Sequence, residues 1–285
     1  MAETIRYIDV DQIAKKTKAL FLKANCMLPI DIKNALLKAR ESERNPLAKE
    51  VLSHILTNAE RAQDAHLALC QDTGIATVFV EIGQDVHITG GTLEEAINRG
   101  IREAYFEGHF RCSVVDDPLF DRKNTNDNTP ASIHIRLVSG SNIRLICMPK
   151  GFGSENVSVI KMMSPSATED DIISLVLNTI ISAGGKPCPP LVVGVGIGGT
   201  FDTVGKLAKE ALTMPLDEAH SEDRYAKLAH RILEAINQTG VGPQGFGGNT
   251  TALGVNIKTA PTHIAGLPVA ICVCCHSCRR AMDVI

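Results

Sequence analysis

The sequence lacks the features that mark membrane, secreted and nucleic-acid-binding proteins. No stretch approaches the roughly 18 uninterrupted apolar residues of a membrane-spanning helix. The first six residues also lack the apolar run of a secretory signal. Neither charge dominates, because 29 basic and 32 acidic residues give a net charge of −3 and a pI of about 6.3. This balance argues against electrostatic binding to nucleic acid or to a membrane, so a small anionic ligand would need a local positive pocket.

Internal repeats, low-complexity tracts and a clear linker are absent as well. Because no secretory signal is evident, the nine cysteines are expected to remain reduced in the cytoplasm, without a disulfide framework. An apolar content of 44% and a charged content of 21% are enough to bury a sizeable core. The chain is therefore predicted to form one large or two small globular domains.

The first 65 residues have the periodicity of helices. Pro29 and Pro46 suit first-turn positions, and Asn45 suits the cap of a helix. That helix carries one apolar stripe, formed by Leu47, Val51, Leu52, Ile55, Leu56 and Ala59. We predict a helical N-terminal segment over residues 1–65, followed by one continuous domain over residues 66–285.

Strand and helix patterns alternate through residues 66–285, which predicts an α/β fold. Alternating or β-branched runs predict strands at 75–82, 131–138, 142–148, 191–195, 252–257 and 268–274. Capping signals and apolar periodicity predict helices at 92–106, 168–184 and 222–239. The short segment 139–141, Ser-Gly-Ser, predicts a hairpin turn between two of the strands.

A glycine pattern at residues 194–199 matches the dinucleotide-binding sequence GxGxxG. A dinucleotide-binding unit also needs a second strand that ends in an acidic residue about 20 positions later. Residues 211–216, before Asp217, have a poor strand sequence. We therefore interpret these glycines as sites of close packing between a helix and a strand.

Three cysteines that are far apart in the sequence each lie among residues suited to an active site. Cys70 begins the segment CQDTG, Cys188 lies between prolines, and Cys275 directly precedes His276. This arrangement indicates a buried metal centre. Three thiolates leave one iron of a cubane cluster open as a Lewis acid, which favours a catalytic centre over an electron carrier.

The cysteine-rich C-terminus also permits a different interpretation. Cys275 and Cys278 have the CxxC spacing of a zinc or redox site. A zinc site of this type needs a second ligand pair, and no separate CxxC or HxxxH pair exists elsewhere in the sequence. A redox protein that binds zinc or a cluster remains an alternative.

Several further motif segments are spread along the chain. Besides CQDTG, they are residues 111–113, 123–130, 150–156, 242–249 and 262–263. From about Glu50 onward, these segments resemble the iron–sulfur-dependent class I fumarate hydratase family, specifically the alpha chain of its two-subunit form. Phe152 departs from the family pattern, which often has a third glycine at that position.

The resemblance implies a hydro-lyase that reversibly hydrates fumarate to malate on a four-iron, four-sulfur (4Fe-4S) cluster. It implies that three irons are held by the metal ligands Cys70, Cys188 and Cys275. The remaining cysteines are expected to be free or structural thiols, namely Cys26, Cys112, Cys147, Cys272, Cys274 and Cys278. The implied catalytic residues are Asp72 and His263, and the implied substrate-binding residues are Gln71, Arg111 and Gly153.

Each implied site residue also has a simpler interpretation. Asp72 suits proton transfer but also a turn or cap, and Gln71 suits a substrate carboxylate but also solvent. Arg111 suits a carboxylate clamp, because a guanidinium binds bidentately, but also an exposed surface position. His263, twelve positions before Cys275, suits proton relay beside a cluster, but a lone histidine is more often a buried structural residue.

Two glycine-rich segments are expected to shape the site. Residues 150–156 offer backbone N–H groups for an anion, with Lys150 adding positive charge, or form only a turn. Residues 242–249 contain four glycines and need unusual backbone angles, which favours a shaping role without chemistry.

Single-chain members of the resembled family continue into a second domain with further substrate-binding residues. We therefore expect a hetero-oligomer with a separate beta subunit and a small dicarboxylate substrate. The alpha chain of tartrate dehydratase also resembles this sequence and is the alternative within the same reaction class. Residues 124–130 and 150–156 favour the fumarate hydratase.

Overall fold

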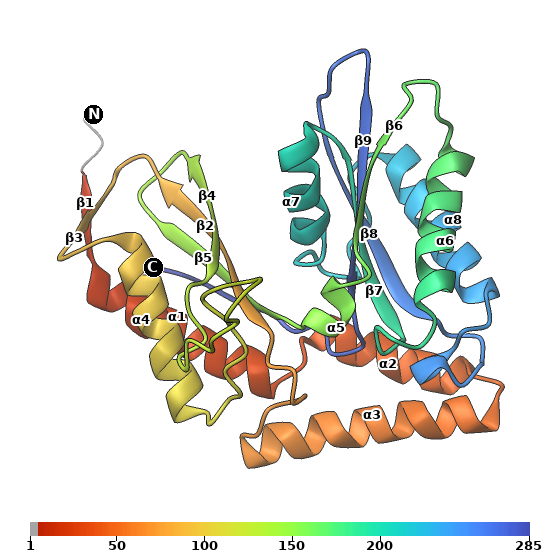
Figure 1. Ribbon diagram of the computed structural model, residues 1–285, viewed down its shortest axis with the longest axis horizontal. Helices are drawn as coiled ribbons and strands as arrows, with labels where there is room; N and C mark the ends of the chain where they lie inside the picture. The colour runs from red at the N-terminus through yellow and green to blue at the C-terminus, as the bar shows by residue number, and fades with distance from the viewer. Residues whose placement is uncertain (1–4) are drawn as a thin grey trace. The chain divides into compact units, whose positions relative to one another are not determined.

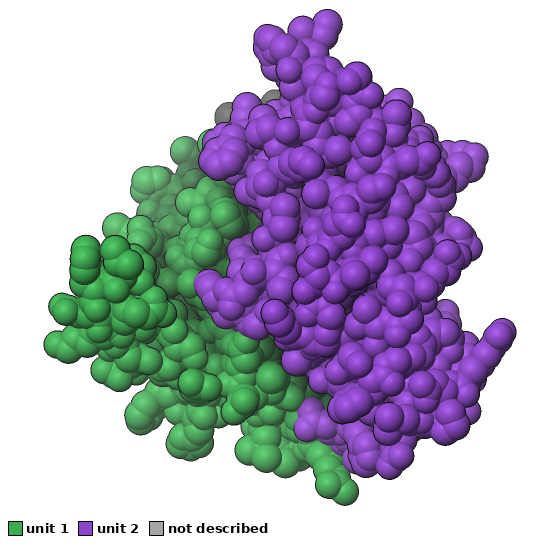
Figure 2. All heavy atoms as spheres, turned by 45° about the vertical axis from the view of Figure 1, so that its right-hand side comes forward, with its two compact units in different colours: residues 1–29, 59–151, 279–285 green, residues 30–58, 152–278 purple. Residues whose placement is uncertain are grey.

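The computed structural model describes residues 5–285, which fall into two compact units (Figure 1, Figure 2). Unit 1 contains the described residues up to 29 together with 59–151 and 279–285, and unit 2 contains 30–58 and 152–278. The α/β class predicted from the sequence is confirmed. These units do not divide at residue 65, because the helix over Pro46–Ala65 contributes residues to both.

Unit 1 is built on a sheet of four strands in the order β10-β5-β2-β4. β2 pairs in parallel with β4 and antiparallel with β5, and β10 is antiparallel to β5. The separate strands β1 and β3 form a parallel pair. The elements are β1 (Arg6–Asp9), α1 (Val10–Cys26), β2 (Ile75–Gly83), β3 (Val86–Thr89), α4 (Leu93–Glu107), β4 (Ser132–Val138), β5 (Ile143–Lys150) and β10 (Ala281–Val284).

The core of unit 1 lies between helices α1 and α4 and one face of this sheet. The two helices approach closely at Gly100, where an added Cβ would lie 2.4 Å from the carbonyl oxygen of Ala14. Buried apolar side chains fill the core, including Ile13, Phe21, Ile97, Ile101, Val78, Val80 and Leu145. The N-cap predicted at Thr92 is confirmed, since its Oγ1 accepts a hydrogen bond from the Glu95 N–H at 3.2 Å.

The hairpin predicted around residues 139–141 is wrong. β4 and β5 both exist, but each pairs with β2, which lies between them. The connection crosses the end of β2, where the Gly83 N–H donates to the Asn142 carbonyl at 2.9 Å. Alternation in the sequence indicates that a strand is half-buried but does not identify the neighbouring strand. The four connecting residues, 139–142, are long enough to span two strand spacings of about 4.8 Å.

Unit 2 contains a second four-stranded sheet in the order β6-β9-β7-β8. β7 is parallel to β8 and antiparallel to β9, which is in turn antiparallel to β6. The elements are α2 (Ile30–Ser42), the part of α3 (Pro46–Ala65) up to residue 58, α5 (Phe152–Glu155), β6 (Val159–Met163), α6 (Glu169–Ala183), β7 (Leu191–Gly198), α7 (Phe201–Ala211), α8 (Asp223–Gln238), the 3-10 turn η1 (Pro243–Gly245), β8 (Ala252–Ala260) and β9 (Leu267–Cys274).

Helix α7 covers one face of this sheet, and α6 and α8 cover the other (Figure 1). The packing role predicted for the glycine pattern is confirmed on the α7 face. An added Cβ at Gly194 would lie 2.1 Å from the Ala208 carbonyl oxygen, and one at Gly196 would lie 2.5 Å from that of Val204. The capping box at Thr168 and Asp171 that begins α6 is also confirmed.

The turn between α2 and α3 is joined to the glycine-rich segment 242–249. Asn45 caps α3 as predicted, because its Oδ1 accepts from the Leu47 N–H at 3.0 Å. The carboxylate of Glu43, which is 4% exposed, accepts from the backbone N–H groups of Arg44, Asn45 and Asn249. A buried acid thus fixes a helix junction against a distant loop.

Four strands were not predicted from the sequence: β1, β3, β6 and β10. Each has four or five residues, and β1 lies inside the segment that was expected to be helical. Within residues 5–285, none of the helices combines the length and the apolar sequence needed to cross a bilayer.

Candidate functional site

The CQDTG segment forms a tight turn that enters β2 of unit 1. Gly74 has a φ of 72°, and an added Cβ there would lie 2.5 Å from the backbone of Lys150, so this position requires glycine. The Asp72 Oδ1 accepts a hydrogen bond from the Gly74 N–H at 3.0 Å. An added Cβ at Gly151 would lie 3.1 Å from the Asp72 Oδ2, so the carboxylate lies against that backbone.

Side chains from distant parts of unit 1 hold this turn. The Tyr105 hydroxyl donates to the Thr73 carbonyl at 2.7 Å, and the Thr73 hydroxyl donates to the Arg111 carbonyl at 2.5 Å. The Asn128 Nδ2 donates to the Gly74 carbonyl at 3.1 Å, while the Asn128 Oδ1 accepts from the Ser113 N–H at 2.8 Å. Three of the segments identified in the sequence, 70–74, 111–113 and 123–130, therefore meet in unit 1.

Burial and hydrogen bonding shift the pKa values of two groups in this part of unit 1. Burial raises the pKa of the Tyr105 hydroxyl well above its ordinary value, so it remains a donor. For Asp127, burial alone would raise the pKa, but hydrogen bonds from the Thr129 backbone and hydroxyl bring it below the ordinary value. At neutral pH the Tyr105 hydroxyl therefore stays protonated and the Asp127 carboxyl group stays ionised.

Arg111 and Gln71 are exposed at the edge of this clamped turn. Only the backbone carbonyl of Arg111 is used in holding Thr73, and its guanidinium makes no ion pair or hydrogen bond with residues 5–285. The Gln71 amide likewise has no side-chain partner in that range. The arrangement can present a planar cation and a neutral amide to an anionic ligand.

Cys188 and Cys275 lie at one end of the sheet in unit 2. Cys188 precedes β7 and Cys275 follows β9, and these antiparallel strands align with Val192 opposite Cys274. The backbone N–H of His276 donates to the Cys188 carbonyl at 3.2 Å, so the two cysteine-bearing segments are in direct contact. This proximity could not be derived from positions 87 residues apart in the sequence.

His263 lies at the opposite end of the same sheet. The preceding Thr262 donates to the Gly199 carbonyl at 2.8 Å, just beyond the end of β7. Eight residues of β9 separate the His263 loop from Cys275, which corresponds to roughly 25 Å at 3.3 Å per residue. Within one chain His263 is not beside Cys188 or Cys275, and its catalytic role stays a prediction that this placement does not support.

Gly153 lies in the one-turn helix α5, where a loop or turn was expected. Gly153 is exposed, and an added Cβ there would have no neighbour within 4 Å. Glu155 fixes α5 through an ion pair with Lys209 at 2.5 Å and through a contact of its Oε2 with the Cys272 Sγ at 3.8 Å. Lys150, in unit 1, is fully buried and donates to the Gly151 carbonyl at 3.1 Å.

The nine cysteines differ in exposure, and this tests which can serve as metal ligands. Cys70 and Cys275 are partly exposed and Cys188 is exposed, which suits thiolate ligation. Burial raises the pKa of the Cys26, Cys112 and Cys147 thiols, and so disfavours their thiolates. The donor chemistry of the three predicted ligands therefore fits a cluster.

The two cysteines of the C-terminal CxxC pair differ in exposure. Cys278 is fully buried, and its Sγ contacts the Leu212 carbonyl oxygen at 3.9 Å. Cys275 is partly exposed. The structure therefore gives the zinc interpretation no open thiol pair. Across residues 5–285, no three His, Cys, Asp or Glu side chains are grouped closely enough to hold a metal ion.

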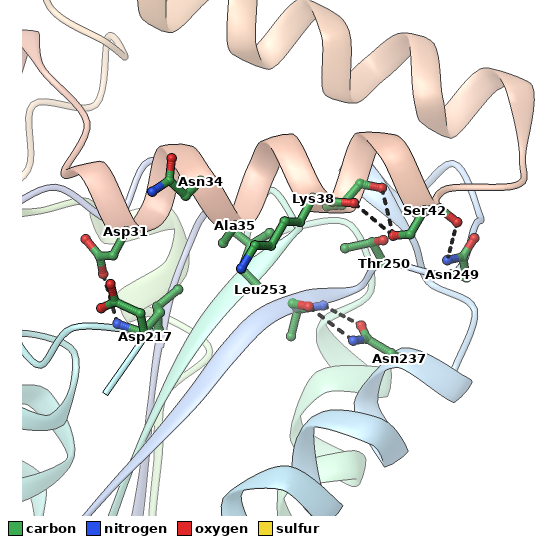
Figure 3. Close-up of a pocket in the computed structure, with 13 residues that line it drawn as sticks. Asp31, Asn34, Ala35, Lys38, Ser42, Asp217, Asn237, Asn249, Thr250 and Leu253 are labelled. Atoms are coloured by element: carbon green, nitrogen blue, oxygen red, sulfur yellow. Dashed lines mark hydrogen bonds between the residues drawn. The ribbon is translucent and has the colours of Figure 1, made fainter. Parts of the chain in front are cut away.

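A cavity of about 460 Å³ lies elsewhere in unit 2, between α2 and the start of β8 (Figure 3). Its lining includes Asn34 and Lys38 from α2, together with Asp217, Thr250 and Leu253. None of the site residues predicted from the sequence lines it. The cavity therefore adds no residue to the candidate site.

Comparisons with known proteins agree with the motif content. The family described as Fumarate hydratase (Fumerase) matches residues 14–283. A relative from Methanocaldococcus jannaschii, named "Putative L(+)-tartrate dehydratase subunit alpha", is 42% identical over 267 residues, covering 92% of this chain and 94% of the relative. The "L(+)-tartrate dehydratase subunit alpha" of Escherichia coli O157:H7 is 26% identical over 284 residues, covering 98% and 93% respectively. The chain belongs to the fumarate hydratase (Fumerase) family.

Proposed function

We propose that this chain is the alpha subunit of a hydro-lyase that interconverts fumarate and malate. The family match over residues 14–283 supports the reaction class. The observation that carries the proposal is the clamped turn in unit 1, which fixes Asp72 while leaving the Arg111 guanidinium exposed and without a partner among residues 5–285. A fixed carboxylate on the turn and an exposed cation on the segment bound to it suit proton transfer on an anionic substrate.

The cofactor in this proposal is a 4Fe-4S cluster with Cys70, Cys188 and Cys275 as ligands. Their exposure and the contact between the Cys188 and His276 segments support this choice. When bound, such a cluster supplies an open iron that acts as a Lewis acid toward substrate oxygen atoms. The family likeness supports this cofactor as well.

The side chains have separate tasks in the proposed reaction. The Arg111 fork pairs with one substrate carboxylate, and Gln71 donates a hydrogen bond without adding charge. The Asp72 carboxylate takes or returns a proton, with its orientation fixed by the Gly74 N–H. Backbone N–H groups near Gly153 contribute to carboxylate binding.

Tartrate is a second candidate substrate. The relatives at 42% and 26% identity are both named as alpha subunits of tartrate dehydratase. Malate and tartrate are both 2-hydroxydicarboxylates, so the same carboxylate clamp and proton-transfer group serve either one. The ratio of kcat/KM for the two substrates decides between them.

A separate beta subunit is the proposed partner, and the hetero-oligomer is the proposed active form. The word "subunit" in the names of both relatives supports this, and each relative is matched over at least 93% of its length. A dicarboxylate has two charged ends, and groups on both sides of the substrate are needed to hold them. The second subunit would supply the remaining groups.

The proposal is tested by anaerobic reconstitution of the chain, alone and with the candidate beta subunit. Iron and labile sulfide are counted, and dehydration of malate and of L-tartrate is then assayed. We expect four irons per chain, and dehydratase activity only when the beta subunit is present. Full turnover by this chain alone would contradict the need for a partner. Stoichiometric zinc without sulfide, or reversible redox chemistry without hydratase activity, would favour the redox-protein alternative.

A further inference from the structure

The turn that carries Cys188 is unusually poor in hydrogen-bond donors. Its sequence over residues 187–190 is Pro-Cys-Pro-Pro, and proline has no backbone N–H. The one available N–H, from Cys188, donates to the Gly185 carbonyl at 3.0 Å. The carbonyl groups of Cys188 and Pro189 must therefore find donors outside the turn.

Two distant residues supply those donors, and each uses both its backbone and its side chain. The backbone N–H of His276 lies 3.2 Å and its ring Nδ1 3.1 Å from the Cys188 carbonyl oxygen. The backbone N–H of Gln244 lies 2.8 Å and its side-chain Nε2 2.9 Å from the Pro189 carbonyl oxygen. Both carbonyl groups are thus satisfied by residues from other segments of unit 2.

The chemistry of the acceptor assigns the proton on the His276 ring. A carbonyl oxygen only accepts, so Nδ1 carries the hydrogen in its contact with Cys188. The Gln244 Nε2 lies 3.2 Å from the same Nδ1 but has an acceptor in the Pro189 carbonyl. The two side chains therefore serve adjacent carbonyl groups of the turn.

Backbone strain shows why these bonds matter. Cys188 has a φ of 55° and Gln244 a φ of 54°, in the left-handed region that is strained for a residue other than glycine. The φ at Cys188 determines the direction of its Cβ and hence of its thiol. The donors from His276 and Gln244 hold this strained turn in place.

We propose that His276 and Gln244 are positioning residues that orient the Cys188 thiol for cluster binding, already in the metal-free chain. This inference rests on the proposed function for its cluster. His276 directly follows Cys275, so one residue joins the two ligand-bearing segments of unit 2. His276 acts through the backbone of Cys188. It orients this ligand in the way that a hydrogen-bonded neighbour orients a metal ligand in other sites.

The decisive comparison uses two substitutions at one position. His276→Leu keeps the backbone N–H and removes the ring donor, whereas His276→Asn returns an amide N–H close to the position of Nδ1. His230→Leu is the matched control, because His230 lies on α8 with a side chain that is 69% exposed. All variants are made in the full chain.

Two measurements are made on each variant. In the metal-free chain, amide hydrogen exchange is followed over residues 186–191 and 242–246. His276→Leu is expected to exchange roughly tenfold faster there, which is the effect of losing about 1.4 kcal/mol of local protection. After anaerobic reconstitution, the same variant should release iron to a chelator several-fold faster. His276→Asn and His230→Leu should resemble the wild type in both.

The results test the positioning role of His276 and the proposed function separately. Unchanged exchange and unchanged iron release in His276→Leu would overturn the inference, as would an asparagine variant that behaves like leucine. A wild-type chain that assembles no cluster would overturn the proposed function. In that case the exchange measurement still decides whether His276 holds the turn, so the two failures are distinguishable.

Discussion

The guanidinium of Arg279 donates a hydrogen bond to the backbone carbonyl of Asp72, a residue 207 positions earlier in the chain. Its Nε also donates to the Pro149 carbonyl at 3.4 Å, and the residue is only 2% exposed. Arg279 thus fixes the CQDTG turn and the end of β5 from inside unit 1. A buried cation here acts as a structural anchor directly behind a candidate catalytic carboxylate.

Replacement of this anchor should lower the stability of the chain. Arg279→Leu leaves the Asp72 and Pro149 carbonyl groups without their donor, so the free energy of unfolding should fall by about 2–4 kcal/mol. Urea denaturation of the metal-free protein measures this change. Arg224→Leu, at a side chain that is 73% exposed, should change stability by less than about 0.5 kcal/mol. Equal effects of the two substitutions would contradict the anchoring role.

The glycine pattern on β7 gives a steric prediction. A Cβ at Gly194 would lie 2.1 Å from the Ala208 carbonyl oxygen, so Gly194→Ala must force α7 away from the sheet. We expect a loss of roughly 1–3 kcal/mol or more in the free energy of unfolding. Gly266→Ala is the control, because an added Cβ there meets nothing within 4 Å. Thermal unfolding of both variants tests this prediction. A wild-type melting temperature for Gly194→Ala would refute close packing of α7 at this position.

Local signals in the sequence were sufficient to predict many of the elements. The caps at Thr92, Thr168 and Asn45 were correct because a capping side chain and its target N–H lie within three residues of each other. The pairing of β4 and β5 was wrong, because β2 belongs to a distant part of the sequence and competes for the same edges. Short strands such as β10 have too few residues to show alternation.

The candidate site shows the same limit. The motif segments were recognisable, but their contacts depend on pairs far apart in sequence, such as Asn128 with Gly74. Arg279 follows Cys278 in a run with Arg280 that has the composition of a charged surface. Its burial depends on the Asp72 and Pro149 carbonyl groups, which no sequence pattern identifies as acceptors.

The lowered pKa of Asp127 predicts a pH-dependent contribution to stability. A carboxyl group with a lowered folded-state pKa stabilises the fold above its unfolded pKa of about 3.9, and loses this contribution as the pH falls through the folded-state pKa. Asp127→Asn should therefore be less stable than the wild type near neutral pH, by about 1 kcal/mol or less, and the difference should vanish in acid. Melting temperatures from about pH 7 to about pH 2 measure it, because the series must extend well below the unfolded pKa of about 3.9.

Asp217→Asn provides the control for this titration, since Asp217 is an exposed carboxylate. Its substitution should change the melting temperature little near neutral pH, because the side chain is exposed. A difference between wild type and Asp127→Asn that persists at the acid end would assign the effect to something other than the Asp127 charge.

Arg111 provides a test of the carboxylate clamp. Arg111→Lys keeps the charge but loses the planar fork, which should cost about 1.5–3 kcal/mol, or roughly tenfold to over a hundredfold in kcat/KM. The cluster content should be unchanged. Arg122→Lys, at an exposed arginine that donates to the Pro118 carbonyl, is the control and should retain activity. Unchanged kinetics in the Arg111 variant would make Arg111 an ordinary surface residue.

The last prediction separates ligand cysteines from structural ones. Serine at Cys70, Cys188 or Cys275 should abolish a stable cluster, because the alcohol is a poor replacement for an iron-bound thiolate. Serine at Cys272 or Cys278 should largely preserve iron and sulfide, because both thiols are buried and their sulfur atoms contact Glu155 and the Leu212 carbonyl. Iron and sulfide counting after anaerobic reconstitution, normalised to folded protein, checks both groups. Full cluster content in the Cys188→Ser protein would remove the proposed ligand set, and cluster loss confined to Cys275→Ser and Cys278→Ser would favour the C-terminal CxxC pair.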